Sequence, residues 1–205
     1  MHTKRGFTLI EMLVVLAIIV FMVTAVLANT HGITLEARAK AAASTVLDLI
    51  KDTRNRSVAV KQFTTGTFPS YGLDFDLSRP QQVIVYADCI ADDNADGIVD
   101  NKDTFNYISG GGSCTGGSLV STNKLDTQTK IGAIRAVFPV SGGSIRTVSE
   151  SRVDILFLRP EPTIWIWTAT DGVLTAGHVE VDIEDTTGKY IRTVSLYSTG
   201  EASMK

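Results

Sequence analysis

A twelve-residue acidic segment, residues 92–103, has the side chains and the spacing of a calcium-binding loop. Calcium takes about six to eight oxygen ligands, and such a loop supplies them from positions 1, 3, 5, 7, 9 and 12, with glycine at position 6. Gly97 occupies the sixth position, and Ile98 at the seventh would offer its backbone carbonyl. The side-chain oxygens in register are those of Asp92, Asn94, Asp96, Asp100 and Asp103. This register predicts bound Ca²⁺; an acidic, solvated turn is the alternative, because Asp, Asn and Gly are also common turn residues.

Two cysteines flank this segment, Cys89 before it and Cys114 after it. An even number of cysteines in an oxidising compartment predicts a disulfide, which would close the base of the acidic segment. Two reduced, buried cysteines are the alternative, because free cysteine is often a core residue.

A carboxylate, Glu11, lies at the start of a long apolar segment. The seventeen residues from Met12 to Ala28 carry no charge, which is close to the ~20 residues that a helix needs to cross a membrane. Lys4 and Arg5 precede this segment, so the amino terminus is expected to stay cytoplasmic and the rest of the chain to be exported. A carboxylate inside such a segment costs about 2.5–3.5 kcal/mol on insertion scales, so its presence indicates a function.

The sequence gives little support for an enzyme. It has three histidines, no cysteine–histidine zinc spacing and no Gly-x-Ser-x-Gly motif. His178 is interpreted as a strand-face residue rather than as the partner of Asp182 in a triad. Trp165 and Trp167 alternate with isoleucines, which favours packing in a core or a subunit contact. The formal net charge is −3 and no cluster of basic residues follows Lys4 and Arg5, so nucleic-acid binding is not indicated.

Two periodicities predict an α+β fold, with a long amino-terminal helix packed on an antiparallel β-rich head. Apolar residues recur at three- and four-residue steps to about residue 60, with a possible weak point at residues 29–32. Beyond residue 61 the period becomes two, and Asp171-Gly172 and Thr187-Gly188 are typical hairpin turns. The predicted strands are Gln82–Ala87, Ile131–Val140, Val153–Leu158, Thr163–Thr168, His178–Ile183 and Tyr190–Ser198.

The basic leader, Gly6, Phe7 and the carboxylate of Glu11 together resemble the amino terminus of type IV prepilins and type II secretion pseudopilins. The resemblance implies that a prepilin peptidase cuts between Gly6 and Phe7 and that the new amino terminus of Phe7 is methylated. It also implies that Glu11 pairs with the amino terminus of a neighbouring subunit, which would offset the cost of burying both charges. The alternative is an ordinary signal peptide cut after Ala28, but a carboxylate such as Glu11 has no use in the apolar core of a signal peptide. The alternative role for Glu11 itself is a carboxylate that snorkels to the membrane interface.

The order of elements after the helix is similar to the GspH/FimT branch of minor pseudopilins, including a last strand that ends at Ser198-Thr199-Gly200. The resemblance divides the chain into a leader (1–6), a membrane and assembly helix (7–28), an amphipathic helix (29–60) and a β-rich head (61–205). It implies an inner-membrane subunit that an assembly platform builds into a filament with other pilin-like subunits. A minor pilin that captures DNA or a surface is the second hypothesis, although the carboxyl-terminal region offers only Lys189, Arg192 and Lys205 as cations.

Overall fold

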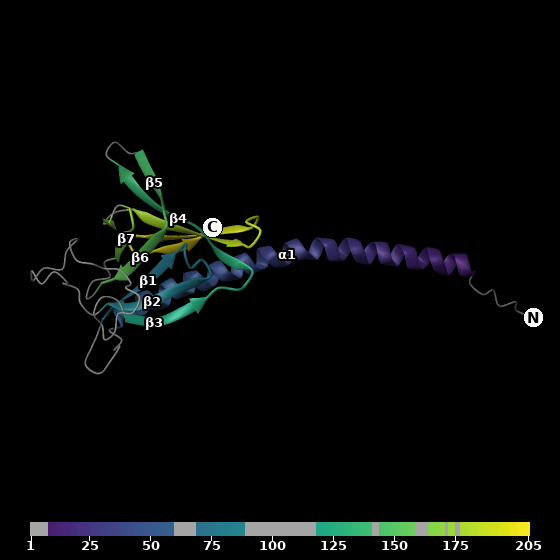
Figure 1. The fold of residues 1–205 in the computed structure, drawn as a ribbon, viewed down its shortest axis with the longest axis horizontal. Coiled ribbons are helices and arrows are strands. Elements are labelled where there is room, and N and C mark those ends of the chain that lie inside the picture. Colours follow the sequence, from purple (N-terminus) through teal and green to yellow (C-terminus); the bar gives the residue numbers. More distant parts are fainter. Residues whose placement is uncertain are drawn as a thin grey trace, which may run out of the picture.

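The computed structural model describes residues 8–59, 69–88, 118–140, 144–158, 164–170, 172–174 and 177–205. Within these residues it contains one long helix and two antiparallel sheets (Figure 1). The elements are α1 (Leu9–Val58), β1 (Ser70–Asp76), β2 (Gln82–Asp88), β3 (Ser118–Lys124), β4 (Thr129–Val140), β5 (Ser144–Glu150), β6 (Arg152–Phe157), β7 (Ile164–Thr168), β8 (Gly172–Leu174), β9 (His178–Asp185), β10 (Ile191–Tyr197) and β11 (Ala202–Met204). The α+β fold and its long amino-terminal helix are therefore as predicted.

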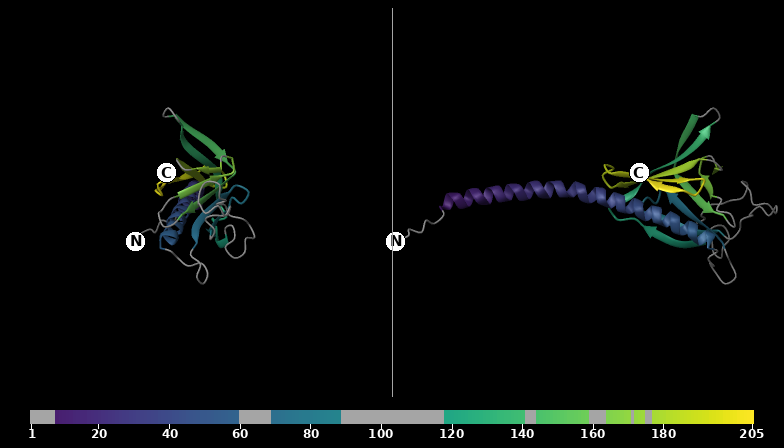
Figure 2. Two further views of the ribbon diagram at one scale, coloured as in Figure 1. Left: turned by 90° about the vertical axis from the view of Figure 1, so that its left-hand side faces the viewer. Right: turned by 180° about the vertical axis from the view of Figure 1, so that it is seen from behind.

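Helix α1 runs without interruption for 50 residues, or about 75 Å at 1.5 Å per residue. The backbone of residues 29–32 is helical, so the predicted weak point does not break the helix. The first half of α1 projects away from the rest of the molecule, and the second half lies along the head (Figure 2). The buried side of this second half consists of small and aliphatic residues spaced three and four apart: Leu35, Ala39, Ala42, Ala43, Val46 and Ile50.

The far end of α1 is fixed to both sheets by polar contacts. The buried Ser57 hydroxyl donates to the Phe157 carbonyl (2.8 Å) and accepts from the Tyr71 amide (2.8 Å). Arg54 donates from Nη1 to the Gly200 carbonyl at 3.1 Å. Gly200 has a φ of 87°, which suits glycine in the turn that leads into β11. The last strand is β11, whereas the strands predicted from the sequence end at residue 200.

The two sheets have the strand orders β3-β2-β1-β6-β7-β8 and β11-β10-β9-β4-β5. All of the pairings between neighbouring strands are antiparallel, as the uninterrupted series of predicted strands required. One face of each sheet and the second half of α1 share a single core. Alternate residues of several strands enter it, such as Leu73 and Phe75 of β1 and Val179 and Val181 of β9.

The six strands predicted from alternation correspond to β2, β4, β6, β7, β9 and β10. The Thr187-Gly188 turn is confirmed between β9 and β10, where Gly188 has a φ of 70°. Five strands were missed: β1, β3, β5, β8 and β11. Asp171 of the other predicted turn lies outside the described residues.

Candidate functional site

The first half of α1 is an apolar surface that the fold leaves uncovered. Residues Leu9–Leu27 are long and apolar enough to cross a membrane, and none of this span is buried in the molecule. It is the one such helix in the described part of the chain. Large side chains along it are mostly exposed, for example Leu9 at 84% and Phe21 at 74%. A surface of this size needs a lipid bilayer or other helices to cover it.

Thr8 and Glu11 form a capping box at the amino terminus of α1. The Glu11 amide donates to the Thr8 hydroxyl oxygen (3.3 Å), and Oε2 of Glu11 accepts from the Thr8 amide (2.8 Å) and hydroxyl (2.9 Å). This arrangement satisfies amide groups that have no partner within the helix. In the single subunit, Glu11 therefore stabilises the beginning of the helix. This role was not predicted from the sequence, although the Thr-x-x-Glu spacing ahead of an apolar run is its usual signal.

Several predicted site residues lie outside the described residues. Gly6 and Phe7 are among them, so cleavage and methylation at these positions stay predictions. The predicted calcium ligands Asp92, Asn94, Asp96, Ile98, Asp100 and Asp103 and the predicted disulfide between Cys89 and Cys114 also lie outside. Among the described residues, no group of three histidine, cysteine, aspartate or glutamate side chains is placed to hold a metal ion.

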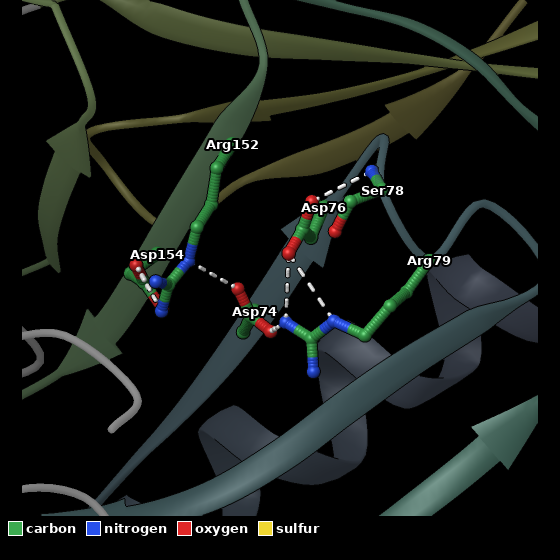
Figure 3. A network of polar contacts seen from close by, with 6 residues as sticks. All are labelled: Asp74, Asp76, Ser78, Arg79, Arg152 and Asp154. Atoms are coloured by element: carbon green, nitrogen blue, oxygen red, sulfur yellow. Dashed lines mark hydrogen bonds and ion pairs between the residues drawn. The ribbon is translucent and has the colours of Figure 1, made fainter. Parts of the chain in front are cut away.

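The outer face of the six-stranded sheet carries a buried network of charged side chains (Figure 3). Asp74 and Asp154, which are 1% and 0% exposed, lie opposite each other on β1 and β6. Arg152 bridges them: its Nε donates to Asp74 at 2.8 Å and its Nη2 to Asp154 at 3.1 Å. Arg79, in the turn after β1, donates from Nη2 to Asp74 (2.5 Å) and to Asp76 (3.0 Å).

The surroundings shift the pKa values of the charged groups in this network in different directions. Burial raises the pKa of Asp74, although Arg152 and Arg79 oppose that shift. For Asp76 partial burial is outweighed by hydrogen bonds from Ser78 and Arg79, which lower its pKa. Burial works against the charge of Arg152, but Asp154 and Asp74 raise its pKa. No bound substrate or cofactor is needed to account for these pairings, and we interpret the network as fixing the turn between β1 and β2.

The structure does not form the triad that His178 and Asp182 could have suggested. Arg135 holds both oxygens of Asp182, with Nη1 at 2.6 Å and Nη2 at 2.8 Å. Thr193 donates to the same carboxylate at 2.7 Å. His178 instead lies 3.6 Å from Glu180 and packs against the ring of Tyr197. The strand-face interpretation of His178 is therefore confirmed.

The two tryptophans of β7 face away from the main core. The isoleucines on either side of them, Ile164 and Ile166, are buried in the main core, whereas Trp165 and Trp167 are half-buried. Trp165 packs on a smaller cluster that includes Leu156 on β6. The guanidinium of Arg152 lies 6.0 Å from the centre of the Trp167 ring. Both tryptophans thus pack against neighbours on the outer face of the six-stranded sheet.

Comparison with known proteins identifies the amino-terminal region. Residues 1–27 match the family model of the prokaryotic N-terminal methylation motif. No curated protein and no solved structure matches the chain. The matched residues include Glu11 and the apolar span of α1, and the match ends before the head. For residues 1–27, this motif supports the resemblance to type IV prepilins and pseudopilins.

Proposed function

We propose that the chain is a minor pilin or pseudopilin, a structural subunit of a type IV pilus or a type II secretion pseudopilus. A prepilin peptidase removes residues 1–6, and α1 then anchors the subunit in the inner membrane with the head exported. An assembly platform moves the subunit into a helical filament with other pilin-like subunits. The observation that carries this proposal is the exposed apolar span Leu9–Leu27 directly within the methylation motif.

The transition from membrane to filament requires no covalent chemistry beyond processing. The apolar half of α1 is covered by lipid before assembly and by the helices of neighbouring subunits afterwards, so it avoids water in both states. In the filament, Glu11 sets the axial register between subunits, because its carboxylate would meet the amino terminus of an adjacent subunit in an environment that excludes water. Pairing of the two charges offsets their desolvation there, while an unpaired charge would disfavour any other register.

The capping box engages only one of the two carboxylate oxygens of Glu11. In the membrane-anchored subunit, Oε2 of Glu11 is engaged by Thr8. Glu11 Oε1 makes no hydrogen bond to a described residue, so one oxygen is available to a neighbour while the cap persists. A carboxylate accepts up to about four hydrogen bonds, so both contacts are compatible with its chemistry.

We further propose that residues 92–103 bind calcium and that a disulfide between Cys89 and Cys114 closes this segment. The support is the ligand register in the sequence and the export of the head into an oxidising compartment. The bound ion would stabilise the head by neutralising carboxylates that otherwise repel one another.

Filament assembly can be tested by shearing. An epitope-tagged full chain is co-expressed with a pilus or pseudopilus system, and sheared filaments are separated from membranes. The proposal expects the mature chain in the filament fraction when prepilin peptidase is present and only the precursor in the membrane when it is absent. A chain that remains in the membrane fraction with the peptidase and platform active would contradict the proposal.

A further inference from the structure

Three turns form the end of the head that faces the apolar half of α1 (Figures 1 and 2). They are residues 77–81 between β1 and β2, residues 125–128 between β3 and β4, and residues 186–190 between β9 and β10. The first two turns are joined by the backbone, because the Leu125 amide donates to the Gln81 carbonyl at 2.8 Å. The second is fixed to α1 by a hydrogen bond between Arg38 and Gln128, and the β9–β10 hairpin by the Arg192–Glu36 ion pair at 2.7 Å.

This end of the head, which we call the basic end, carries more cations than its carboxylates engage. Three of its cations are paired: Arg79 with Asp74 and Asp76, Lys130 with Glu184, and Arg192 with Glu36. Four others are exposed and make no ion pair with a described carboxylate: Arg38, Lys40, Lys124 and Lys189. The carboxylates of the second and third turns are occupied locally, since Asp126 accepts from the Gln128 amide (2.8 Å) and Asp185 from the Tyr190 amide (2.8 Å).

The cations surround a concave surface. A pocket of about 380 Å³ lies between the first two turns and is lined by Arg79, Lys124 and Lys130, together with Pro80, Gln81 and Gln82. Amide donors next to cations suit the oxygens of a phosphate group. At the β9–β10 turn, the Lys189 ammonium lies 5.1 Å from the centre of the Tyr190 ring. A lysine beside a tyrosine is typical of surfaces that meet lipid headgroups, where an amphipathic ring is favoured.

The helix determines how far this surface lies from the bilayer. From Leu27, the last residue of the apolar span, to Arg38 there are eleven residues, or about 16 Å of helix. The headgroup layer accounts for about 5–8 Å of that distance. The remaining gap is about one Debye length at physiological salt, so the cations lie within the field of an anionic membrane surface. A tilt of α1 by about 20°, usual for membrane helices, would bring one side of the head closer.

We propose that the basic end of the head binds anionic phospholipid headgroups on the face of the membrane in which α1 is anchored. The proposal rests on the membrane-anchored state described under Proposed function. The contact would hold the waiting subunit against the bilayer, and extraction into a filament would break it. Duplex DNA has the same phosphate chemistry, but only the membrane is held at this distance from the basic end, because α1 anchors the head to it.

Lysine footprinting of the full chain tests this proposal. The chain is reconstituted into nanodiscs of phosphatidylcholine alone or of phosphatidylcholine mixed with phosphatidylglycerol, and lysines are acetylated briefly and quantified by mass spectrometry. Acetylation of Lys124 and Lys189 is expected to fall about fivefold in the anionic discs and to recover at high salt. Lys51, exposed at the opposite end of the head-bound helix, is the internal reference and should not change.

Variants and alternative ligands complete the experiment. Lys124→Glu should weaken the protection of Lys189, whereas the matched reversal Lys51→Glu should not. Inorganic phosphate or duplex DNA added to the neutral discs should leave the lysines reactive; protection by DNA there would assign the surface to nucleic acid and overturn the proposal. Equal acetylation in both kinds of disc, or an equal fall at Lys51, would also overturn it. Failure of the chain to insert into either disc would instead contradict the membrane-anchored state itself.

Discussion

Glu11 has two separable properties at the scale of a single residue. Its side chain caps α1 through Thr8, and we propose that its charge pairs with a neighbouring subunit. A glutamine at this position can still accept the hydrogen bonds of the capping box but carries no charge. The two properties can therefore be tested separately.

We predict that Glu11→Gln and Glu11→Ala both leave membrane insertion intact and both reduce incorporation into filaments, because each removes the charge that pairs with a neighbour. Removal of a carboxylate also lowers the insertion cost by about 2.5–3.5 kcal/mol. The measurement is the ratio of mature chain in the sheared filament and membrane fractions. Loss of incorporation for alanine but not for glutamine would show that the cap, and not the charge, is required.

Asp185 organises the turn between β9 and β10. Its carboxylate accepts hydrogen bonds from the backbone amides of Thr187, Lys189 and Tyr190. Burial opposes its charge, but these bonds and the Thr187 hydroxyl outweigh burial and lower its pKa. A lowered pKa in the folded state means that the stabilisation is present above the unfolded value of 3.8 and is lost as the pH falls through the folded value.

We predict that Asp185→Asn lowers the free energy of unfolding by about 1.5–3 kcal/mol at neutral pH, the usual contribution of hydrogen bonds to a charged group. The difference from the wild type should begin to shrink as the pH falls below 3.8 and should disappear once the pH is below the lowered pKa of the folded state, because the folded wild-type carboxylate is then protonated too. Denaturant unfolding of the head, followed by tryptophan fluorescence across pH, measures both effects. The control is Asp48→Asn, which changes an exposed residue of α1. A difference in unfolding free energy between wild type and Asp185→Asn that does not change with pH would contradict the prediction.

At the scale of elements, β1 and β2 meet where a glycine faces a tyrosine. Gly72 pairs with Tyr86, and a Cβ on Gly72 would lie 2.3 Å from Cζ of the fully buried Tyr86 ring and 2.7 Å from the Ile155 carbonyl. Neither neighbour can move freely, because one is a packed ring and the other is backbone. This close approach explains why the centre of β1 has no side chain at this position.

We predict that Gly72→Ala destabilises the head by about 1–3 kcal/mol, the usual cost of overpacking a core. Gly132→Ala is the matched control, since its Cβ would meet the end of the Glu184 side chain, which is 18% exposed and can rotate away. Thermal melting of the two variants compares the costs. Equal destabilisation by Gly72→Ala and Gly132→Ala would show that the contact with Tyr86 is not what excludes a side chain at residue 72.

Sequence patterns predicted the elements whose two faces differ in polarity. The helix and strands such as β7, where isoleucines alternate with tryptophans, are of this kind. β1 was not predicted although Tyr71, Leu73 and Phe75 alternate; Asp74 and Asp76 on its other face are of a residue type that is depleted in strands. Asp74 is paired with Arg79 of the following turn and with Arg152, which only the pairing of β1 with β6 brings to it. The separation of Asp74 and Arg152 by 78 residues gives no sign of that contact. β3 and β5 are edge strands with mostly polar residues, which a hydrophobic pattern does not detect.

The acidic segment gives a further prediction at this scale. A ligand that binds only the folded state stabilises it by about 2.7 kcal/mol at a hundredfold excess over Kd. The melting temperature of the wild-type head should therefore be higher in millimolar calcium than in chelator. Asp96→Ala should remove this difference, because it deletes a charged ligand and retains Gly97. Identical wild-type curves in calcium and chelator would reduce residues 92–103 to an acidic turn.

At the scale of the whole molecule, one helix connects two environments. Its apolar span Leu9–Leu27 is not buried in the described part of the molecule, and its second half is part of the core of the head. The head is therefore fixed relative to the membrane by the same element that would build the filament. The anchored subunit must retain the apolar span after processing, since cleavage after Ala28 would release the head and discard Glu11.

The mass of the mature amino terminus tests this point most directly. The full chain is expressed with its prepilin peptidase, purified from membranes and analysed by mass spectrometry of its amino-terminal peptide. We predict a peptide that begins at Phe7 and carries one additional methyl group, and an uncut precursor for Gly6→Leu. A mature chain that begins at Asn29 would contradict the account.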